Sequence, residues 1–423
     1  MMISLQEARA RILDAIEPLA VETVNLDQAL GRVVASPVQA LLDIPRFDNA
    51  SVDGYAVRTR DLRAHSNDPT ARSRDSGSES SESSESLSEM RPIRLPVHSR
   101  VAAAGDPPLE GLPDGTCARI FTGAPLPPGT DAVVMQEDTR AEPPGWVTLL
   151  ASVTPWEGVR FAGEDVRRGS PLASAGQRLR PAHLGLLAAA GVGALKVRRR
   201  PRITLLTTGN ELVEPSADVP PGKLPDSNRF LLRALAERSG ACVARGAWVP
   251  DDLEAIMGAL GEAAATSDLV VTTGGVSVGD ADLLKSAFTR LGGRLDLWRI
   301  AVKPGKPFAW GRLGNCHWFG LPGNPVAVFA TWQVLVLPAL RRFEADQELV
   351  GRVGIARLSE PVTNRGDRLH LLRVHVDSKG SVRPIGMQAS HIQSGLAAAN
   401  ALLHVPAGSA WETGREVEVE WID

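Results

Sequence analysis

From Pro201 onward, short apolar runs alternate with amphipathic stretches, and this rhythm constrains the fold more than any other feature of the chain. The runs "ITLLTTG", "CVARGAWV" and "DLVVTTGG" each precede a helical pattern, and the series ends with the long "PVAVFATWQVLVLPALRRF". Strands that alternate with helices predict a parallel sheet with helices on both faces. Such sheets bind ligands at the carboxyl ends of their strands, so we expect a site there.

β-like segments flank this region on both sides. Short strand-like runs separated by Pro and Gly fill Ile93 to Ala151, and period-2 alternation returns after Glu344, ending in "REVEVEWI". The predicted fold class is α/β multidomain, with a central parallel α/β sheet domain and flanking small β-rich domains. We expect four parts: a discontinuous N-terminal linker or dimer domain (1–44 and 152–200), an inserted β domain (45–151), the central α/β domain (201–342) and a C-terminal β domain (343–423).

Two helices are expected outside the central domain. One runs from Leu5 to about Glu17 and is opened by a capping box in which Ser4 precedes Glu7 by three residues. The other begins at about Pro181 and ends near Gly191, because Pro suits the first turn of a helix and Gly its end. No apolar stretch approaches the roughly 20 residues that a membrane span needs.

The segment 65–90, "HSNDPTARSRDSGSESSESSESLSEM", has almost no apolar residues. Ser, Glu and Asp bury too little apolar surface to offset the entropy of ordering. We therefore predict a disordered insertion in a surface loop, without an assigned role.

Charge and cysteine content exclude several functions. A net charge of -3 over 423 residues gives no electrostatic footprint for nucleic acid or for an anionic membrane. Cys117, Cys242 and Cys316 are odd in number and far apart, which argues against disulfides and a zinc site. We expect them to be small buried hydrophobes in a reducing compartment. With no signal-peptide pattern at the N-terminus, a cytoplasmic location is expected.

Chemistry-bearing residues follow several of the predicted strands. They are Asn210 and Glu211, the "PDD" of 250–252, the glycine turn after "DLVVTT", the "KPGKP" of 303–307 and the "LPGNP" of 321–325. Glycine turns that lead into helices expose N–H groups to anions, and Lys303 and Lys306 suit a phosphate-like group. Carboxylates beside such a site would repel an anion unless a cation lies between them, which favours Mg²⁺.

Each of these residues also has a purely structural explanation. Asp280 or Asp282 fits a helix cap, Asn324 before Pro325 fits an N-cap and first-turn pair, and the lysines fit a solvated surface. Their joint occurrence on one predicted rim favours a functional site.

A serine hydrolase is the main catalytic alternative. Gly275 to Gly279 reads G-x-S-x-G with Ser277 as nucleophile, and five histidines follow as possible bases: His317, His370, His375, His391 and His404. The chain lacks an HGGG-type oxyanion segment, and the "KPGKP" turn has no role in acyl transfer.

Eight segments carry a family resemblance: "PRFDNASVDGYA", "RIFTGAPLPPGTDAVV", "GEDV", "LLTTGNEL", "PDSNRFLL", "TTGGVSVGDADLLK", "AVKPGKPFAWG" and "GLPGNPVAV". In this order and over nearly the whole chain, they resemble the molybdopterin molybdenumtransferases, or molybdenum insertases, which include the C-terminal domain of gephyrin. The central part alone is similar to molybdopterin adenylyltransferases, and the flanking domains favour the insertase.

This resemblance implies an enzyme that cleaves adenylylated molybdopterin with Mg²⁺, inserts molybdate and releases AMP. It implies a homodimer, with each site completed by the other subunit's Asp53 and Thr122 region. The implied catalytic residues are Asp53, Thr122, Asp165, Glu211, Asp251, Asp282 and Lys303, with Glu211 and Asp282 as metal ligands. The implied substrate-binding residues are Gly274, Gly275, Ser277, Lys306, Pro322, Gly323, Asn324 and Ser394.

The sequence departs from the family pattern at a few positions. Ser51 is displaced by one place, Asn210 stands where Asp is common, and Ala327 stands where Ser is common. The Asn210 and Ala327 departures bear on the tuning of oxyanion contacts. A non-catalytic scaffold of the same fold is a further alternative, but it would have no need of Asp53, Glu211, Asp282 and Lys303.

Overall fold

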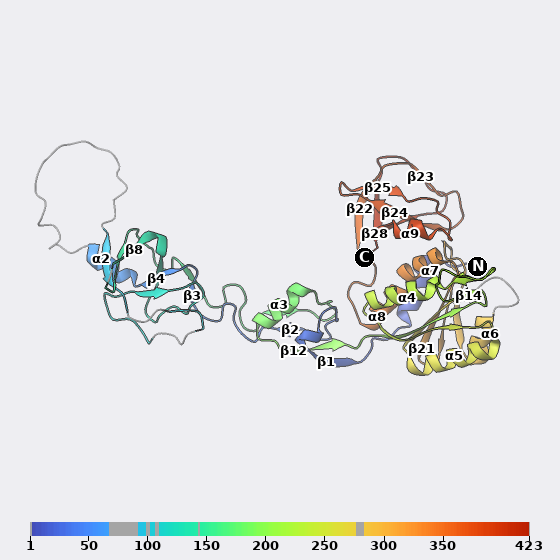
Figure 1. Cartoon of the computed structure of the whole chain (residues 1–423), viewed down its shortest axis with the longest axis horizontal. Coiled ribbons are helices and arrows are strands. Elements are labelled where there is room, and N and C mark those ends of the chain that lie inside the picture. The colour runs from blue at the N-terminus through green and yellow to red at the C-terminus, as the bar shows by residue number, and fades with distance from the viewer. Residues whose placement is uncertain are drawn as a thin grey trace, which may run out of the picture. The chain divides into compact units, whose positions relative to one another are not determined.

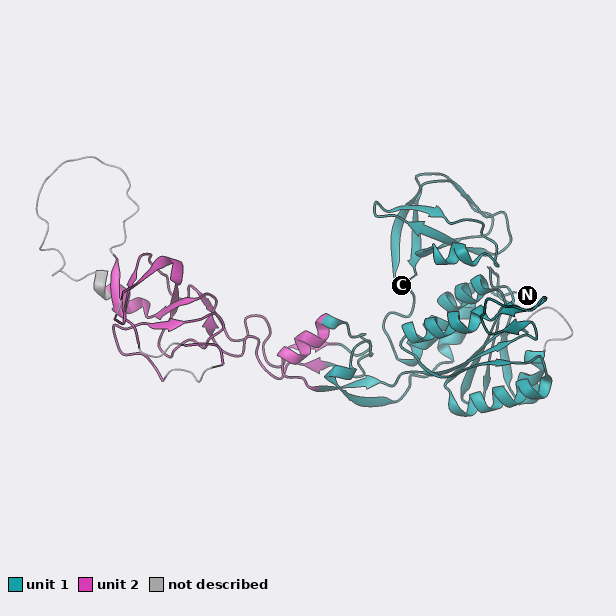
Figure 2. Ribbon diagram, in the orientation of Figure 1, with its two compact units in different colours: residues 1–37, 174–181, 194–423 teal, residues 38–173, 182–193 magenta. Residues whose placement is uncertain are grey.

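The computed structural model describes residues 2–66, 92–98, 102–105, 110–142, 144–275 and 283–422. The chain divides into two compact units (Figure 2). Unit 1 comprises Met1–Pro37, Ser174–Pro181 and Ala194–Asp423, and unit 2 comprises Val38–Ala173 and Ala182–Gly193. The division into four domains stays a prediction.

The main sheet of unit 1 has six strands. Their order is β16 (Cys242–Val249), β13 (Arg202–Thr208), β17 (Leu269–Thr273), β21 (Cys316–Leu321), β20 (Ala309–Leu313) and β18 (Arg294–Trp298). The first four are parallel, as the alternating pattern predicts. β20 was not expected: it runs antiparallel to β21 because a tight turn with Gly314 at φ +60° joins them. The sheet is therefore mixed at one edge.

Helices cover both faces of this sheet (Figure 1). One face packs against α1 (Leu5–Asp14), α4 (Ser227–Arg238), α7 (Pro325–Thr331) and α8 (Leu337–Phe343). The other packs against α5 (Leu253–Thr266) and α6 (Leu283–Arg290). All five residues of β17 are buried, as expected of a strand covered on both faces.

Helix α1 begins and ends close to the predicted positions. The Ser4 hydroxyl accepts from the Glu7 backbone N–H at 3.1 Å, so half of the predicted capping box is formed. The Glu7 carboxylate pairs instead with Arg11 one turn later. The helix ends at Asp14, about three residues before the predicted end at Glu17.

The stretch Pro325–Phe343 is continuous: α7, a π-helical turn at Trp332–Val336 and α8. Its 19 residues are long and apolar enough to cross a membrane, which the sequence analysis did not anticipate. Because 89% of this apolar window is buried against the rest of the protein, it serves here as a core helix.

A second sheet of unit 1 follows from residue 302. Its strands are β19 (Val302–Lys303), β24 (Leu369–Val376), β25 (Ser381–Pro384), β22 (Val353–Leu358), β28 (Glu416–Trp421) and β26 (Ala401–Val405), and β26 also pairs with β24. This last pairing closes the sheet around a core of aliphatic residues. Two short strands, β23 (Val362–Thr363) and β27 (Ala410–Trp411), and helix α9 (Gln393–Ala397) complete this part. β19 lies between β18 and β20 in sequence but pairs with β24, so Lys303 is held by the second sheet.

The remaining strands of unit 1 are short. β1 (Val21–Asn25) pairs with β12 (Ala194–Arg198), and β14 (Leu212–Val213) pairs with β15 (Leu224–Pro225). A 3-10 turn at Leu26–Gln28 follows β1.

Unit 2 is built from short antiparallel strands. β4 (Gly54–Val57) lies between β6 (Ala118–Ile120) and β7 (Ala132–Met135), which a 3-10 turn at Gln136–Asp138 follows. β9 (Trp146–Leu149) lies between β5 (Ile93–Pro96) and β8 (Thr139–Glu142). Two further antiparallel pairs lie closer in sequence to the boundaries of unit 2: β2 (Val38–Gln39) with β11 (Pro171–Ala173), and β3 (Asn49–Ala50) with β10 (Val159–Arg160). Helix α3 (Pro181–Ala189) also lies at such a boundary.

Helix α2 (Thr59–Ser66) was not predicted. It covers His65 and Ser66, the first two residues of the segment expected to be disordered. The remaining part of that segment, 67–90, lies outside the described residues.

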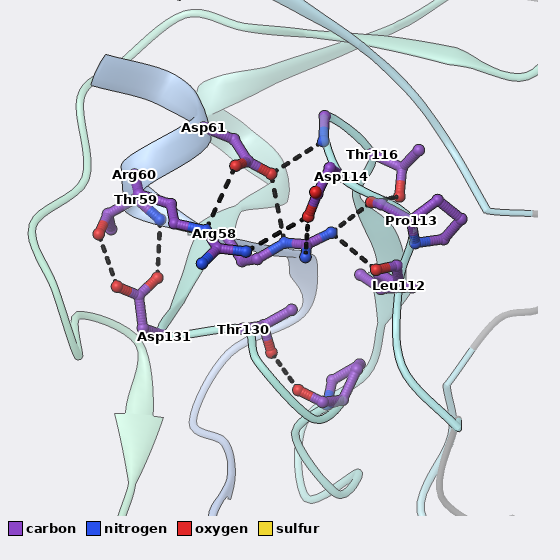
Figure 3. A network of polar contacts seen from close by, with 12 residues as sticks. Arg58, Thr59, Arg60, Asp61, Leu112, Pro113, Asp114, Thr116, Thr130 and Asp131 are labelled. Atoms are coloured by element: carbon purple, nitrogen blue, oxygen red, sulfur yellow. Dashed lines mark hydrogen bonds and ion pairs between the residues drawn. The ribbon is translucent and has the colours of Figure 1, made fainter. Parts of the chain in front are cut away.

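A buried arginine ties α2 to the loop before β6 (Figure 3). Arg58, 8% exposed, donates to the carbonyl oxygens of Leu112 (2.7 Å) and Pro113 and pairs with Asp61 and Asp114. Asp61 in turn accepts from the Gly115 N–H at 2.9 Å. The guanidinium therefore supplies donors to a loop that has no strand partner at these positions.

The three cysteines are free thiols. Cys117 and Cys316 are buried, and burial raises the pKa of each to about 12. Cys242 is exposed on the edge strand β16, contrary to the expectation that all three are buried.

Candidate active site

The parallel strands of the main sheet end level with one another. Thr207 of β13 lies opposite Thr273 of β17, which lies opposite Leu321 of β21. The loops after these strands therefore leave the sheet at one edge. They carry Glu211, Gly274, Gly275 and the "PGN" of residues 322–324.

One cavity at this edge, the carboxylate pocket, has a volume of about 280 Å³ and is lined by Thr208, Gly209, Glu211, Asp251, Gly274 and Gly275, among others. Two reciprocal hydrogen bonds fix its wall. The Asn210 N–H donates to Asp251 Oδ2, and the Asp251 N–H donates to Asn210 Oδ1, both at 3.1 Å. These bonds join the loops after β13 and β16 and hold Asp251 beside Glu211 in the lining.

Gly274 is required by its surroundings. Its φ is +89°, and a Cβ there would lie 2.4 Å from the Thr208 carbonyl oxygen. Gly209 has φ +146°, and a Cβ on it would lie 2.6 and 2.7 Å from the two Glu211 carboxylate oxygens. The Glu211 carboxylate therefore lies directly over the Gly209 backbone, whose φ of +146° favours glycine.

A second cavity, the lysine pocket, has a volume of about 560 Å³. It is lined by Lys303, Lys306, Pro322, Asn324, Arg368 and the segment 387–391, among others. Both lysines are exposed. The pocket thus places three cationic side chains beside the "PGN" loop, as oxyanion binding requires.

His370 lies beside the lysine pocket, opposite Lys303 in the β19–β24 register. Burial, then the nearby charges of Lys303, Arg373 and Arg368, lower its pKa to about 4. His370 is therefore neutral near pH 7, and lysine and arginine supply the positive charge of the pocket.

The loops of the two pockets meet at Gly274 and Gly323. A Cβ on Gly323 would lie 4.0 Å from the Gly274 Cα. Asn228 of α4 donates to the Gly323 carbonyl oxygen at 2.7 Å and lies 3.5 Å from the Thr273 hydroxyl. A side chain that is 9% exposed thus links the ends of β17 and β21.

Asn324 occupies the predicted N-cap position of α7, but its side chain does not cap the helix. Its amide donates instead to the Ser390 hydroxyl at 2.9 Å. Capping of α7 therefore explains the position of the Asn324 side chain only in part. The hydrogen bond to Ser390 connects the "PGN" loop to the part of the chain that forms the second sheet.

In unit 2, Asp53 and Thr122 are in contact. The backbone N–H and the hydroxyl of Thr122 both donate to Asp53 Oδ1 at 2.7 Å. These two bonds, with a smaller effect of the Arg119 charge, lower the pKa of Asp53. Asp53 is half-buried, and its lowered pKa keeps it ionised near pH 7. Asp165 lies elsewhere in the unit, in an exposed turn whose backbone bonds to Ile44.

The other predicted residues are placed as follows. Ser394 is exposed on α9, whose neighbouring Gln393 approaches Ser227 at 3.4 Å. Ser277, Asp280 and Asp282 lie outside the described residues, so the predicted metal pair of Glu211 and Asp282 stays a prediction. Among the described residues, no three His, Cys, Asp or Glu side chains form a metal-binding group.

A divalent cation nevertheless fits the carboxylate pocket chemically. Glu211 and Asp251 are exposed carboxylates in one lining. No described group donates a hydrogen bond to the Glu211 carboxylate, whereas Asp251 accepts one from the Asn210 backbone. Carboxylate oxygens of this kind are the ligands that Mg²⁺ takes in ones or twos.

The structure adds residues that the sequence analysis missed. Arg368 and Ser390 come from the second sheet, and no motif marks them. Asn228 ends the "PDSN" segment before a predicted helix, which the sequence analysis noted without giving its side chain a role. A polar residue at the first turn of a predicted helix was the only available signal, and it equally suits a cap.

Two more of the five histidines named for the hydrolase alternative are engaged away from the sheet edge. His317 is buried between Trp310 and Phe343, and burial lowers its pKa to about 4. His404 pairs with Glu420 at 3.0 Å within the second sheet.

Three family models match the chain in sequence order. Residues 3–191 match "MoeA N-terminal region (domain I and II)", residues 204–342 match "Probable molybdopterin binding domain", and residues 355–422 match "MoeA C-terminal region (domain IV)".

Curated relatives and solved structures agree with these matches. A protein of Haemophilus influenzae named molybdopterin molybdenumtransferase is 32% identical over 95% of this chain and 94% of its own length. Molybdopterin molybdenumtransferase 2 of Mycobacterium tuberculosis is 32% identical over 96% of both chains. The crystal structure of the molybdopterin biosynthesis protein MoeA of Pyrococcus horikoshii is 29% identical, with a TM-score of 0.78 over 100% of both chains. Identity of this extent shows that the chain belongs to the MoeA family of molybdopterin molybdenumtransferases.

Proposed function

We propose that the protein inserts molybdate into adenylylated molybdopterin, cleaving the adenylate and releasing AMP, with Mg²⁺ and as a cytoplasmic homodimer. It belongs to a family of molybdenum cofactor biosynthesis enzymes. The proposal that this enzyme inserts molybdate and releases AMP is supported by the pair of pockets at one edge of the main sheet. One is lined by carboxylates and glycine backbone, and the other by lysines and arginine.

The lysine pocket suits molybdate. This ion is a tetrahedral dianion like phosphate, and Lys303, Lys306 and Arg368 provide charge and N–H donors for its oxygens. Because His370 stays neutral, the pocket does not lose charge between pH 6 and 8 through this residue. In this proposal the three cations bind and orient the oxyanion beside the "PGN" loop.

The carboxylate pocket suits the phosphoanhydride end of the substrate. Glu211, Asp251 and, by family resemblance, Asp282 would hold Mg²⁺, which would supply charge compensation at the departing phosphate. Gly274 and Gly275 leave room for phosphate oxygens to approach the backbone. Asn228 keeps this loop beside the "PGN" loop, so the two substrates are held next to each other.

The test is incubation of the purified protein with adenylylated molybdopterin, molybdate and Mg²⁺, with AMP followed by chromatography. We expect AMP to be released in step with molybdenum-loaded cofactor. Reactions that lack molybdate or contain EDTA serve as controls. Failure to release AMP from intact substrate under any of these conditions would contradict the proposed function.

A further inference from the structure

A third cavity of unit 1 shares no lining residue with the carboxylate or lysine pockets. It has a volume of about 410 Å³ and lies between the end of α4, the turn at Gly31 and α8. Its lining includes Arg178, Arg200, Arg238, Arg341, Glu237 and Gln333. Four arginines against one glutamate give this arginine pocket a surplus of positive charge.

Existing ion pairs account for only part of this charge. Buried Glu344 and Asp346 balance Arg178, at 2.6 and 2.9 Å. Glu237 pairs with Arg233 on the exposed side of α4, at 2.8 Å.

Arg200 and Arg238 contribute the surplus. Arg200 donates to the Leu30 carbonyl oxygen at 3.4 Å. Arg238 is exposed. Backbone carbonyls satisfy N–H groups without neutralising a guanidinium, so the pocket favours an anion.

Gln333 gives the pocket a second requirement. It lies in the π-helical turn, is 2% exposed, and its Nε2 donates to Glu420 Oε1 at 3.3 Å. Since an ionised carboxylate only accepts hydrogen bonds, this contact fixes the amide orientation. Its Oε1 has no donor within the described part of the chain. A buried carbonyl without a partner is unfavourable unless a ligand or water supplies a proton.

We propose that the arginine pocket binds a phosphate-class anion that still carries a hydroxyl proton. The guanidinium groups take the charged oxygens, and the hydroxyl donates to Gln333 Oε1. Sulfate has the same shape but no proton near pH 7, so the pocket distinguishes the two anions. Inorganic hydrogen phosphate carries this hydroxyl on phosphorus. A phosphomonoester such as glycerol 3-phosphate carries it on a carbon atom beside the phosphate. The inference does not depend on the proposed function.

The experiment uses full-length protein with Lys303→Ala and Lys306→Ala, so that oxyanion binding at the lysine pocket is weakened. Inorganic phosphate, glycerol 3-phosphate and sulfate are titrated separately by calorimetry at pH 7 and equal ionic strength. We expect phosphate or glycerol 3-phosphate to bind at least tenfold more tightly than sulfate. The tighter of the two identifies the source of the ligand. Equal affinity for sulfate, or no binding of either phosphate compound, would overturn the proposal.

Substitutions then locate the site. Arg200→Ala with Arg238→Ala, both at exposed positions, should weaken phosphate binding at least tenfold while the fold is retained. Arg290→Ala, at the exposed end of α6 and outside the lining, is the control and should bind as the parent does. Gln333→Met, checked for folding by circular dichroism, should lose the preference over sulfate. Unchanged phosphate binding in the Arg200 and Arg238 variant would place the anion elsewhere and refute the assignment.

Discussion

At the residue scale, Lys303 is the side chain whose charge the proposed molybdate site most depends on. Lys303→Ala should raise the KM for molybdate about 10- to 100-fold, since a hydrogen bond to a charged group contributes ~1.5–3 kcal/mol. Binding of adenylylated molybdopterin should change less, because an ammonium is a point charge suited to a small oxyanion. Steady-state AMP release at varied molybdate concentration measures this. Lys379→Ala, in an exposed turn of the second sheet, is the control, and an unaltered molybdate dependence in Lys303→Ala would refute the role.

Glu211 carries the residue-scale prediction for the metal. Glu211→Gln keeps the size of the side chain but removes a ligand charge, so AMP release should fall at least about tenfold and need more Mg²⁺. Asp282→Asn should act in the same direction. Asp218→Asn, at an exposed position outside the pockets, should behave as wild type. If both active-site variants turned over normally and EDTA had no effect, the metal proposal would be wrong.

Asp53 carries the pH prediction at this scale. The Thr122 backbone N–H and then its hydroxyl lower the pKa of Asp53. Thr122→Val removes only the hydroxyl, so the pKa should rise part of the way to its ordinary value, as a carboxyl NMR titration would show. Because the folded-state pKa is depressed, this stabilisation is present above the unfolded-state value of about 3.9 and is lost as pH falls through the folded-state pKa. Thr139→Val, whose hydroxyl bonds to the Gln136 carbonyl oxygen, should leave the Asp53 titration in place.

At the scale of elements, the Arg58 network decides how firmly the loop before β6 is attached (Figure 3). Arg58→Met keeps apolar bulk but removes the guanidinium from the Leu112 and Pro113 carbonyl oxygens and the cationic partner from the largely buried Asp61. The Gly115 N–H stays on Asp61 and the Thr116 hydroxyl stays on Pro113, so the loss is partial. We expect a loss of about 2–4 kcal/mol in the free energy of unfolding of unit 2. Urea denaturation followed by tryptophan fluorescence measures it. Arg60→Met removes a neighbouring guanidinium that is 71% exposed and should cost less than about 1 kcal/mol; equal losses in the two variants would contradict the explanation.

At the scale of the whole molecule, the proposed homodimer predicts that two impaired variants can complement each other in a mixed dimer. If Lys303 of one subunit works with Asp53 of the other, then Asp53→Asn and, at molybdate concentrations far below its raised KM, Lys303→Ala each silence both sites of their own homodimer. Equal co-expression of the two variants would restore one complete site in each mixed dimer, and about a quarter of wild-type AMP release overall. Each variant expressed without the other is the control. No recovery in mixed dimers, once their presence is verified by two affinity tags, would show that the site is not shared.

The sequence by itself determined the elements and the order of the motifs. Hydrophobic periodicity predicted the parallel strands β13, β16, β17 and β21 and the helices between them. Burial of one or both faces of an element requires apolar residues at regular spacing or in a continuous run, which can be recognised within a short stretch of sequence. It also predicted that the glycine, carboxylate and lysine segments would leave the sheet at one edge. β20 and α2 were missed, since a five-residue strand that contains Gly311 and Arg312 and a polar helix both carry a weak apolar pattern.

Only the tertiary structure decided which of these segments share a cavity. Arg368 and Ser390 reach the lysine pocket because β19 joins the second sheet, a contact between residues more than 60 positions apart that no local pattern encodes. Glu211 lies over Gly209, and the Asn324 side chain bonds to Ser390 instead of capping its own helix. Gln333 Oε1 finds no donor among the described residues. Side-chain direction and burial depend on neighbours from distant parts of the chain, so they are fixed only when those parts pack together.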